Sequence, residues 1–178
     1  IVKKIKLIVI GYLIDRKNHL NLFNAIKILK KRGHNIKLTV VGDGLLRSDL
    51  ENYVLNNKLN QNIEFTGLLN RNATFEKIKN SHILISTSIL ETFGVSIAEG
   101  LAVGRPCVVF NSGGPEDIIR EKDGILFSEN SAKSIAKEIN NLIDNYNKYD
   151  QEEISDSCYK RFSEDKIFKS LINEFKKW

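Results

Sequence analysis

Short runs of hydrophobic residues alternate along this chain with longer segments in which hydrophobic residues recur every three or four positions. The short runs, such as 7–10 and 38–41, are almost continuously apolar, which is typical of strands covered by helices on both faces of a sheet. In the longer segments, such as 131–147, the apolar residues fall on one helical face. This alternation predicts an α/β domain built on a doubly wound, Rossmann-like parallel sheet of about six strands.

The same pattern sets approximate bounds for each element. Strands are predicted at 5–10, 36–41, 62–67, 82–86, 106–110 and 124–127. Helices are predicted at 18–31, 45–57, 73–80, 93–103, 115–120 and 131–147. The core of the domain is therefore expected over about residues 5–146 of the 178.

The C-terminal part is expected to be helical over about 150–178, with a polar stretch at 147–157 before its last segment. That segment repeats apolar residues at helical spacing, from Ile167 to Phe175. Because so much apolar surface comes late in the chain, we expect this last helix, at 165–178, to dock on a second domain. The chain starts without a methionine, so we expect it to be the C-terminal domain, 1–178, of a longer protein.

The composition is that of an ordinary globular domain, with 42% hydrophobic and 28% charged residues. No apolar run approaches the roughly 18 residues of a membrane-spanning helix, and no signal segment opens the chain, so we expect a cytoplasmic location. The net charge of +5 is spread along the chain, which favours steering of anionic ligands over nucleic-acid binding. Peripheral association with the inner face of a membrane is the second choice.

Thiol and metal chemistry have no supporting pattern in the sequence. Cys107 and Cys158 lie far apart and lack the spacing of paired ligands, so both are expected to be reduced thiols without a catalytic role. His19, His34 and His82 also lack ligand-like spacing. We therefore expect no metal ion and no cofactor.

One strand-to-helix junction carries the most informative motif, Glu91-Thr92-Phe93-Gly94-Val95-Ser96-Ile97-Ala98-Glu99. Glu91 precedes a helix expected to start near Phe93 or Gly94, and Glu99 lies within it. Free backbone N–H groups at this helix start, Val95 included, favour an anion such as phosphate, and Gly94 lets a ligand approach the backbone. Two carboxylates beside such a pocket suit the vicinal hydroxyl groups of a sugar and a ribose. The alternative is that Glu91 and Glu99 are merely solvated charges at the end of a helix.

The loop after the first predicted strand belongs to the same edge of the sheet, where ligands of this fold bind. Gly11 gives the strand a tight exit, and Arg16 and Lys17 arrive where the next helix begins. Cations at that place would neutralise a diphosphate. A basic pair on a loop is, however, usually solvated.

Two further loops have more than one interpretation. Gly42-Asp43-Gly44 resembles a dinucleotide fingerprint, but Arg47 stands at its third glycine, so a pyrophosphate packed over that helix is not supported. Gly42 is either a turn that lets the backbone bend past a ligand or a plain tight turn. Gly67 and Leu68 could offer backbone groups and an apolar shelf to a base, or form an ordinary loop.

Taken in order, these loops resemble the C-terminal nucleotide-sugar domain of the retaining, GT-B-fold glycosyltransferases of the group 1 type. The matching pieces are Gly11 with Lys17, Val41-Gly42-Asp43-Gly44, Phe65-Thr66-Gly67, Glu91-x-Phe93-Gly94-x4-Glu99, Gly104-x-Pro106, Gly113-Gly114-Pro115-Glu116 and Asp123-Gly124-Ile125-Leu126. Each piece alone is weak, whereas all of them in register over about residues 5–145 are specific.

This resemblance implies a donor site for a nucleotide-sugar, with a UDP-sugar as the commonest choice in the family. Glu91 would contact the transferred sugar, and Glu99 would hold the ribose. Lys17 would bind the diphosphate, together with backbone N–H groups of Phe93 and Gly94. The resemblance also implies retaining, metal-independent transfer to a polysaccharide or lipid-linked acceptor held by an N-terminal domain, without which the fragment would bind a nucleoside diphosphate weakly and transfer nothing.

One departure from the family pattern concerns the cations of this site. Many relatives carry arginine directly after the first glycine, where this chain has Tyr12; our hypothesis is that Arg16 supplies the second cation. Tyr12 also leaves open a non-catalytic nucleotide-binding or regulatory module. A nicotinamide dehydrogenase is disfavoured by Arg47, and a glycan phosphorylase by the lack of a lysine suited to anchor pyridoxal phosphate.

Overall fold

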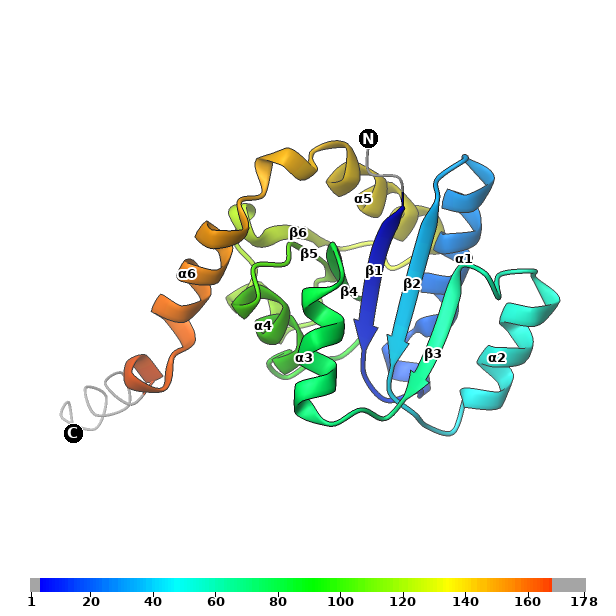
Figure 1. The fold of residues 1–178 in the computed structure, drawn as a ribbon, viewed down its shortest axis with the longest axis horizontal. Helices are drawn as coiled ribbons and strands as arrows, with labels where there is room; N and C mark the ends of the chain where they lie inside the picture. The colour runs from blue at the N-terminus through cyan, green and yellow to red at the C-terminus, as the bar shows by residue number, and fades with distance from the viewer. Residues whose placement is uncertain (1–3, 168–178) are drawn as a thin grey trace.

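Six parallel strands form the centre of the computed structural model, which describes residues 4–167. The strands are β1 (Ile5–Ile10), β2 (Ile36–Val41), β3 (Ile63–Gly67), β4 (Ile83–Ser86), β5 (Cys107–Phe110) and β6 (Gly124–Phe127). Their order across the sheet is β3-β2-β1-β4-β5-β6 (Figure 1). The predicted doubly wound, Rossmann-like sheet is therefore confirmed.

Helices cover both faces of this sheet (Figure 1). They are α1 (His19–Lys31), α2 (Arg47–Asn56), α3 (Arg71–Lys79), α4 (Val95–Ala102), α5 (Ala132–Asp144) and α6 (Gln151–Phe162). Short 3₁₀ turns add η1 (Asp15–Lys17), η2 (Gly114–Asp117), η3 (Glu121–Asp123) and η4 (Tyr146–Lys148). One buried cluster joins α1, α2 and α5 to the sheet, and a second joins α3, α4 and α6 to its other face.

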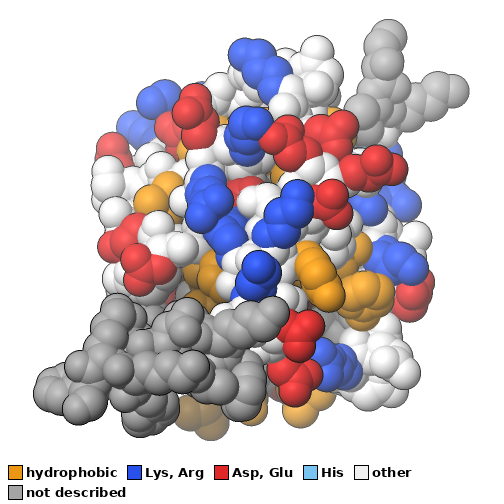
Figure 2. Space-filling view, turned by 90° about the vertical axis from the view of Figure 1, so that its left-hand side faces the viewer, with side chains coloured by type: hydrophobic (Ala, Val, Ile, Leu, Met, Phe, Trp, Pro, Cys, Tyr) orange, Lys and Arg blue, Asp and Glu red, His pale blue; other side chains and the backbone are white. Residues whose placement is uncertain are grey.

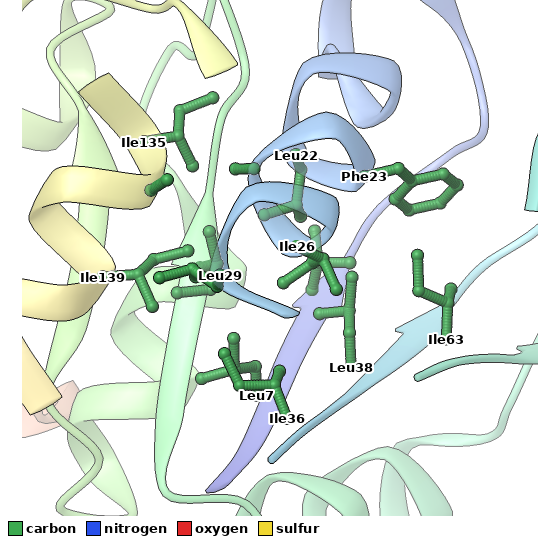
Figure 3. Close-up of a cluster of buried hydrophobic side chains, with 14 of the residues drawn as sticks. Leu7, Leu22, Phe23, Ile26, Leu29, Ile36, Leu38, Ile63, Ile135 and Ile139 are labelled. Carbon is green, nitrogen blue, oxygen red and sulfur yellow. The ribbon is translucent and has the colours of Figure 1, made fainter. Parts of the chain in front are cut away.

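The larger cluster shows why the amphipathic segments become helices. Figure 3 shows apolar side chains of α1 between the sheet and α5: Leu22, Phe23, Ile26 and Leu29 from α1, Leu7 and Leu38 from the sheet, and Ile135 and Ile139 from α5. All of these side chains are fully buried. Burying a side chain of this size contributes roughly 1.5–3 kcal/mol, so this packing holds α1 and the loop before it on the sheet.

Two of the predicted helices differ from the observed ones. Helix α4 begins at Val95, so Phe93 lies before it, because Gly94 takes a left-handed conformation (φ 93°) as its N-cap. The helix predicted at 115–120 is replaced by η2 and η3. Each of these turns is closed by its own carboxylate: Glu116 accepts from the N–H of Gly113 and Asp123 from that of Arg120.

The polar stretch at 147–157 is expected to separate two helical segments, but much of it lies in the helix α6. Asp150 caps this helix by accepting a hydrogen bond from the N–H of Glu153 at 2.9 Å. Ile154 and Cys158, one helical turn apart, are buried against α4. The helix predicted at 165–178 falls for the most part outside the described residues.

Strands β1 and β4 are neighbours at the middle of the sheet. From β1 the chain moves outward to β2 and β3, and it then returns to β4 and continues the other way. The chain therefore turns in opposite directions after β1 and β4, and open α/β sheets bind their ligands in the crevice at such a switch point. The fold places the loops of 11–18 and 87–94 at this crevice.

Candidate functional site

The loops after β1 and β4 meet through an ion pair. The ammonium group of Lys17, in η1, contacts a carboxylate oxygen of Glu91, 74 positions further along the chain. The two side chains are only 15% and 16% exposed. The structure thus joins two of the predicted site residues at the crevice of the sheet.

Glycines make this approach of the loops possible. A Cβ on Gly11 would lie 3.3 Å from Cε of Lys17, so this glycine leaves room for the lysine stem. A Cβ on Gly42 would lie 2.0 Å from the carbonyl oxygen of Gly11, and Gly42 has a φ of 140°. The close packing of the two loops therefore accounts for Gly42, as in the tight-turn interpretation.

The loop after β4 also holds the backbone of η1. The hydroxyl of Thr87 donates to the carbonyl of Lys17 at 3.0 Å, and the hydroxyl of Ser88 donates to the carbonyl of Arg16 at 3.3 Å. The N–H of Ile89 donates to the same carbonyl of Arg16 at 2.8 Å. Thr87 and Ser88 are 1% and 2% exposed. Neither Thr87 nor Ser88 is among the predicted site residues, although both follow directly after the buried strand at 83–86.

The loop after β5 fixes Glu91 from the other side. The N–H of Glu91 donates to the carbonyl of Ser112 at 3.4 Å, and its carbonyl accepts from the N–H of Gly114 at 3.0 Å. A Cβ on Gly114 would lie 2.4 Å from the carbonyl oxygen of Thr92. The glycine pair at 113–114 is therefore explained by the approach of the loop that carries Glu91.

The N-terminus of α4 follows Glu91 directly and is electrostatically uncompensated. Gly94 supplies no side-chain cap, and the first turn contains no acidic residue. The first intrahelical bonds run from the N–H groups of Ile97 and Ala98 to the carbonyl of Gly94, so those of Val95 and Ser96 have no acceptor within the helix. Such a terminus favours an anion.

Glu99 faces a different part of the surface from Glu91. It lines a groove of about 320 Å³ between α4 and α6, together with Arg71, Val95 and Phe162. Phe93 lies beside this groove; its ring is 42% exposed and meets the ring of Phe162 edge-on at 5.8 Å. The two glutamates of the motif thus lie at two different places, Glu91 beside Lys17 and Glu99 in the groove.

The remaining predicted residues lie around these two places without a contact that defines their role. The side chains of Arg16 and Tyr12 are exposed, Tyr12 by 63%. The carbonyl of Gly67 accepts a hydrogen bond from the N–H of Gly42 at 2.9 Å. Leu68 is 69% exposed, as an apolar shelf for a base would require.

Arg47, which breaks the dinucleotide fingerprint, has partners of its own. Its guanidinium group donates to Asp43 at 3.0 Å and to Glu51 at 2.8 Å, and it lies 5.9 Å from the centre of the Phe65 ring. The hydrogen bond with Glu51 raises the pKa of Arg47. Arg47 therefore stabilises the start of α2 locally.

Metal-binding clusters, reactive thiols and membrane-spanning helices are other features that would indicate a function in the described residues. Within residues 4–167 no group of three or more His, Cys, Asp or Glu side chains is arranged to hold a metal ion. Burial raises the pKa of the Cys107 and Cys158 thiols, which makes both poor nucleophiles. In the same part of the chain no helix is long and apolar enough to cross a membrane.

Figure 2 shows one side of the molecule, with Lys and Arg side chains interspersed with Asp and Glu. The basic side chains on this face therefore have acidic side chains as neighbours and do not form one continuous basic patch. This agrees with the even distribution of charge along the sequence. This face has no concentrated basic patch of the kind that binds a polyanion.

The chain is similar to known proteins in both sequence and fold. An uncharacterized glycosyltransferase of Methanocaldococcus jannaschii is 29% identical over 171 residues, which cover 94% of this chain and 43% of that protein. The galactosyltransferase WaaB of the lipopolysaccharide outer core superposes with a TM-score of 0.85 at 23% identity, over 99% of this chain and 50% of its own. Anabaena HepE, solved with UDP, gives 0.86 at 18% identity, over 98% and 49%.

The chain thus spans about half the length or less of these relatives. The sequence model of the family described as "Glycosyl transferases group 1" matches residues 1–156. The ion pair at the crevice, the uncompensated helix terminus and the groove at Glu99 therefore lie in a chain that belongs to the group 1 glycosyltransferases and has the fold of one half of a GT-B enzyme.

Proposed function

We propose that this chain is the donor-binding domain of a glycosyltransferase that uses a nucleotide-sugar, with UDP as the nucleotide. The observation that supports this most strongly is the pair of Lys17 and Glu91 beside the N-terminus of α4, at the crevice between β1 and β4. The ammonium group of Lys17, the free N–H groups at the start of α4 and the carboxylate of Glu91 lie side by side. The first two can bind an anion, and the third can accept hydrogen bonds from hydroxyl groups. These are the groups that a sugar diphosphate needs.

In this proposal the donor replaces the contact between Lys17 and Glu91. The diphosphate accepts hydrogen bonds from Lys17 and from the free N–H groups of Val95 and Ser96. The carboxylate of Glu91, released from Lys17, accepts from hydroxyl groups of the transferred sugar. Charge that develops on the departing diphosphate is stabilised by groups already in place, which is the usual source of such catalysis.

The second carboxylate and the exposed apolar residues would hold the nucleoside. Glu99 accepts from the ribose hydroxyls in the groove beside α6, and Leu68, next to Gly67, provides a shelf for the base. Support for UDP comes from Anabaena HepE, which was solved with that nucleotide. The relation to the lipopolysaccharide galactosyltransferase WaaB supports a polysaccharide or glycolipid acceptor.

The acceptor would be held by an N-terminal domain that precedes this chain, as the greater length of the relatives suggests. We propose that transfer retains the anomeric configuration, needs no metal ion and takes place in the cytoplasm, at the inner face of the membrane when the acceptor is lipid-linked. Residues 1–178 alone would then bind a nucleoside diphosphate without transferring sugar.

Calorimetric titration of the chain with UDP, GDP, ADP and NAD tests the proposal. We expect UDP to bind, and Glu99→Ala to weaken its binding by about tenfold, through loss of the ribose contact. Binding of NAD alone would replace the proposal with a dehydrogenase. Binding of a nucleotide without transfer by the full-length protein would favour a regulatory module.

Arg16 is tested separately as the second cation of the site. Its side chain is exposed, and it precedes Lys17 in η1. In this proposal Arg16 replaces the arginine that the family pattern has at the position of Tyr12. We expect Arg16→Ala to lower turnover of the full-length enzyme by about 10². Arg32→Ala, which removes an exposed arginine at the opposite end of α1, is the matched control. Equal turnover in both variants would exclude Arg16 from the site.

A further inference from the structure

We propose that Thr87 is a positioning residue that sets the place of Lys17 in the site through a hydrogen bond to its backbone. The hydroxyl of Thr87 donates to the carbonyl of Lys17 at 3.0 Å. Its effect on donor binding rests on the proposed function, whereas its effect on Lys17 itself does not. Thr87 touches neither Glu91 nor the α4 terminus through its hydroxyl, so it would act through Lys17.

The turn that carries Lys17 has little packing of its own. It consists of the three residues of η1, of which Asp15 and Arg16 are exposed and only the side chain of Lys17 is largely covered, and it ends at Asn18 in a left-handed conformation (φ 55°). A short exposed turn of this kind is held by the hydrogen bonds it makes to its surroundings. Four of those contacts come from the loop after β4. Ser88 and Ile89 donate to the carbonyl of Arg16, and the hydroxyl of Thr87 lies 3.0 Å from the carbonyl of Lys17 and 3.4 Å from that of Asn18, so the shorter contact of Thr87 is the one made to Lys17 itself.

One short segment therefore holds Lys17 at two points. Thr87 holds the backbone carbonyl of Lys17, and Glu91, four positions further on, holds its ammonium group. A long lysine side chain reaches a fixed point only when its backbone is fixed as well. Misplacement of a binding group by about 1 Å can lower a catalytic rate by about 10², so this two-point contact matters for the donor site.

The backbone of Thr87 is fixed by a hydrogen bond from the segment that precedes α5. The side-chain amide of Asn130 donates to the carbonyl of Thr87 at 2.8 Å, and the backbone carbonyl of Asn130 accepts from the side chain of Asn21 in α1 at 3.0 Å. Thr87 is 1% exposed. The start of α5 and the first turns of α1 thus fix the loop that positions Lys17, and the hydroxyl of Thr87 is the last link of this chain of contacts.

Two substitutions at this position separate the hydroxyl from the packing of the side chain. Thr87→Val keeps the shape and removes the donor, whereas Thr87→Ser keeps the donor and removes a methyl group. Ser81→Ala is the matched control, because Ser81 is also buried (5% exposed) and its hydroxyl donates to the carbonyl of Lys77, in α3, at 2.8 Å.

The first readout needs no nucleotide. The rate at which acetic anhydride acetylates Lys17, followed by mass spectrometry, reports how well the ammonium group stays paired and buried. We expect Thr87→Val to raise this rate several-fold, with Thr87→Ser and Ser81→Ala close to the wild-type rate. An unchanged rate in Thr87→Val, or an equal rise in Thr87→Ser, would overturn the proposal, since packing alone would then explain the residue.

The second readout is the dissociation constant of UDP, measured by calorimetry on the same variants. We expect Thr87→Val to weaken UDP binding by about fivefold and Thr87→Ser to restore it. Wild-type affinity in Thr87→Val together with faster acetylation would overturn the role in donor binding. Failure of the wild-type chain to bind any nucleoside diphosphate would overturn the proposed function, whereas the acetylation rates would still decide the role of Thr87 for Lys17.

Discussion

Two strand-to-helix loops of this molecule each carry a basic residue paired with carboxylates, yet the two arrangements differ in almost every physical respect. Arg47 pairs with Asp43 and Glu51, each four positions away, and the three side chains are 30–43% exposed. Lys17 pairs with Glu91 across 74 positions, and both side chains are about five-sixths buried. The first arrangement is local and solvated, and the second is long-range and largely shielded from solvent.

The difference indicates what each pair is for. Exposed pairs on neighbouring turns contribute at most about 1 kcal/mol and are common features of helix starts. A buried pair has a desolvation penalty that can exceed its attraction, so stability is a weak reason to retain one. The proposed function supplies another reason, because in it the donor replaces the contact between Lys17 and Glu91 at the crevice of the sheet.

The largest expected effect concerns sugar transfer by the full-length enzyme. Lys17→Met should lower the rate by about 10² to 10³, the usual cost of removing one stabilising donor from the leaving group. Arg47→Met, which removes the cation of the exposed pair, should change the rate by less than about threefold. Steady-state kinetics of the two variants provide the measurement, and equal losses would remove the distinction between the loops.

The next effect is on folding. Glu91→Gln leaves the ammonium group of Lys17 buried without its counter-charge, so we expect the free energy of unfolding to fall by about 3 kcal/mol, at the low end for a broken buried pair. Glu51→Gln should cost less than about 1 kcal/mol. Urea unfolding of both variants tests this, and a loss at Glu51 as large as that at Glu91 would contradict the comparison.

The smallest effect is a pH dependence that belongs to the buried region. His19 lies under the loop of Lys17, where it is 2% exposed and hydrogen-bonded to the carbonyl of Tyr12. Burial lowers its pKa in the fold. Its neutral form therefore stabilises the fold above the unfolded-state pKa of about 6.5, and this contribution is lost as the pH falls below that value, where the unfolded chain binds the proton.

We expect the free energy of unfolding to fall by about 1 kcal/mol more in the wild type than in His19→Gln between pH 7.5 and 5.5. A glutamine amide can still donate to the carbonyl of Tyr12 but does not titrate in this range. Burial also lowers the pKa of His82, so a weaker dependence in the same direction should remain. Identical pH dependence in wild type and His19→Gln would show that His19 contributes none of it.

Much of this molecule could be predicted from the order of apolar runs, and the reason is physical. Strands buried on both faces, such as Leu38 to Val41, have few other possible structures, so the sheet followed from the sequence. The loop motif at Glu91 and Glu99 was recognisable because its residue types and spacing are specific.

The contacts between loops could not be predicted in the same way. The partner of Lys17 is 74 positions away. The place of Thr87 directly after a strand indicates only that it lies near the site, and nothing in the local sequence indicates that it contacts Lys17 or that Asn130 contacts Thr87. Gly42 had two interpretations for a similar reason, since the backbone that approaches it comes from another loop. The helix α6 overlaps the polar stretch at 147–157 and buries only Ile154 and Cys158, so its periodicity was weak.

The central claim is that the buried pair, and not the exposed one, belongs to a nucleotide-sugar site. Calorimetric titration of UDP into the wild-type chain, Lys17→Met and Arg47→Met tests it directly. We predict that Lys17→Met weakens UDP binding by at least about tenfold, or about 1.4 kcal/mol, and that Arg47→Met binds within about twofold of the wild type. Wild-type affinity in Lys17→Met, or equal weakening in both variants, would contradict the account.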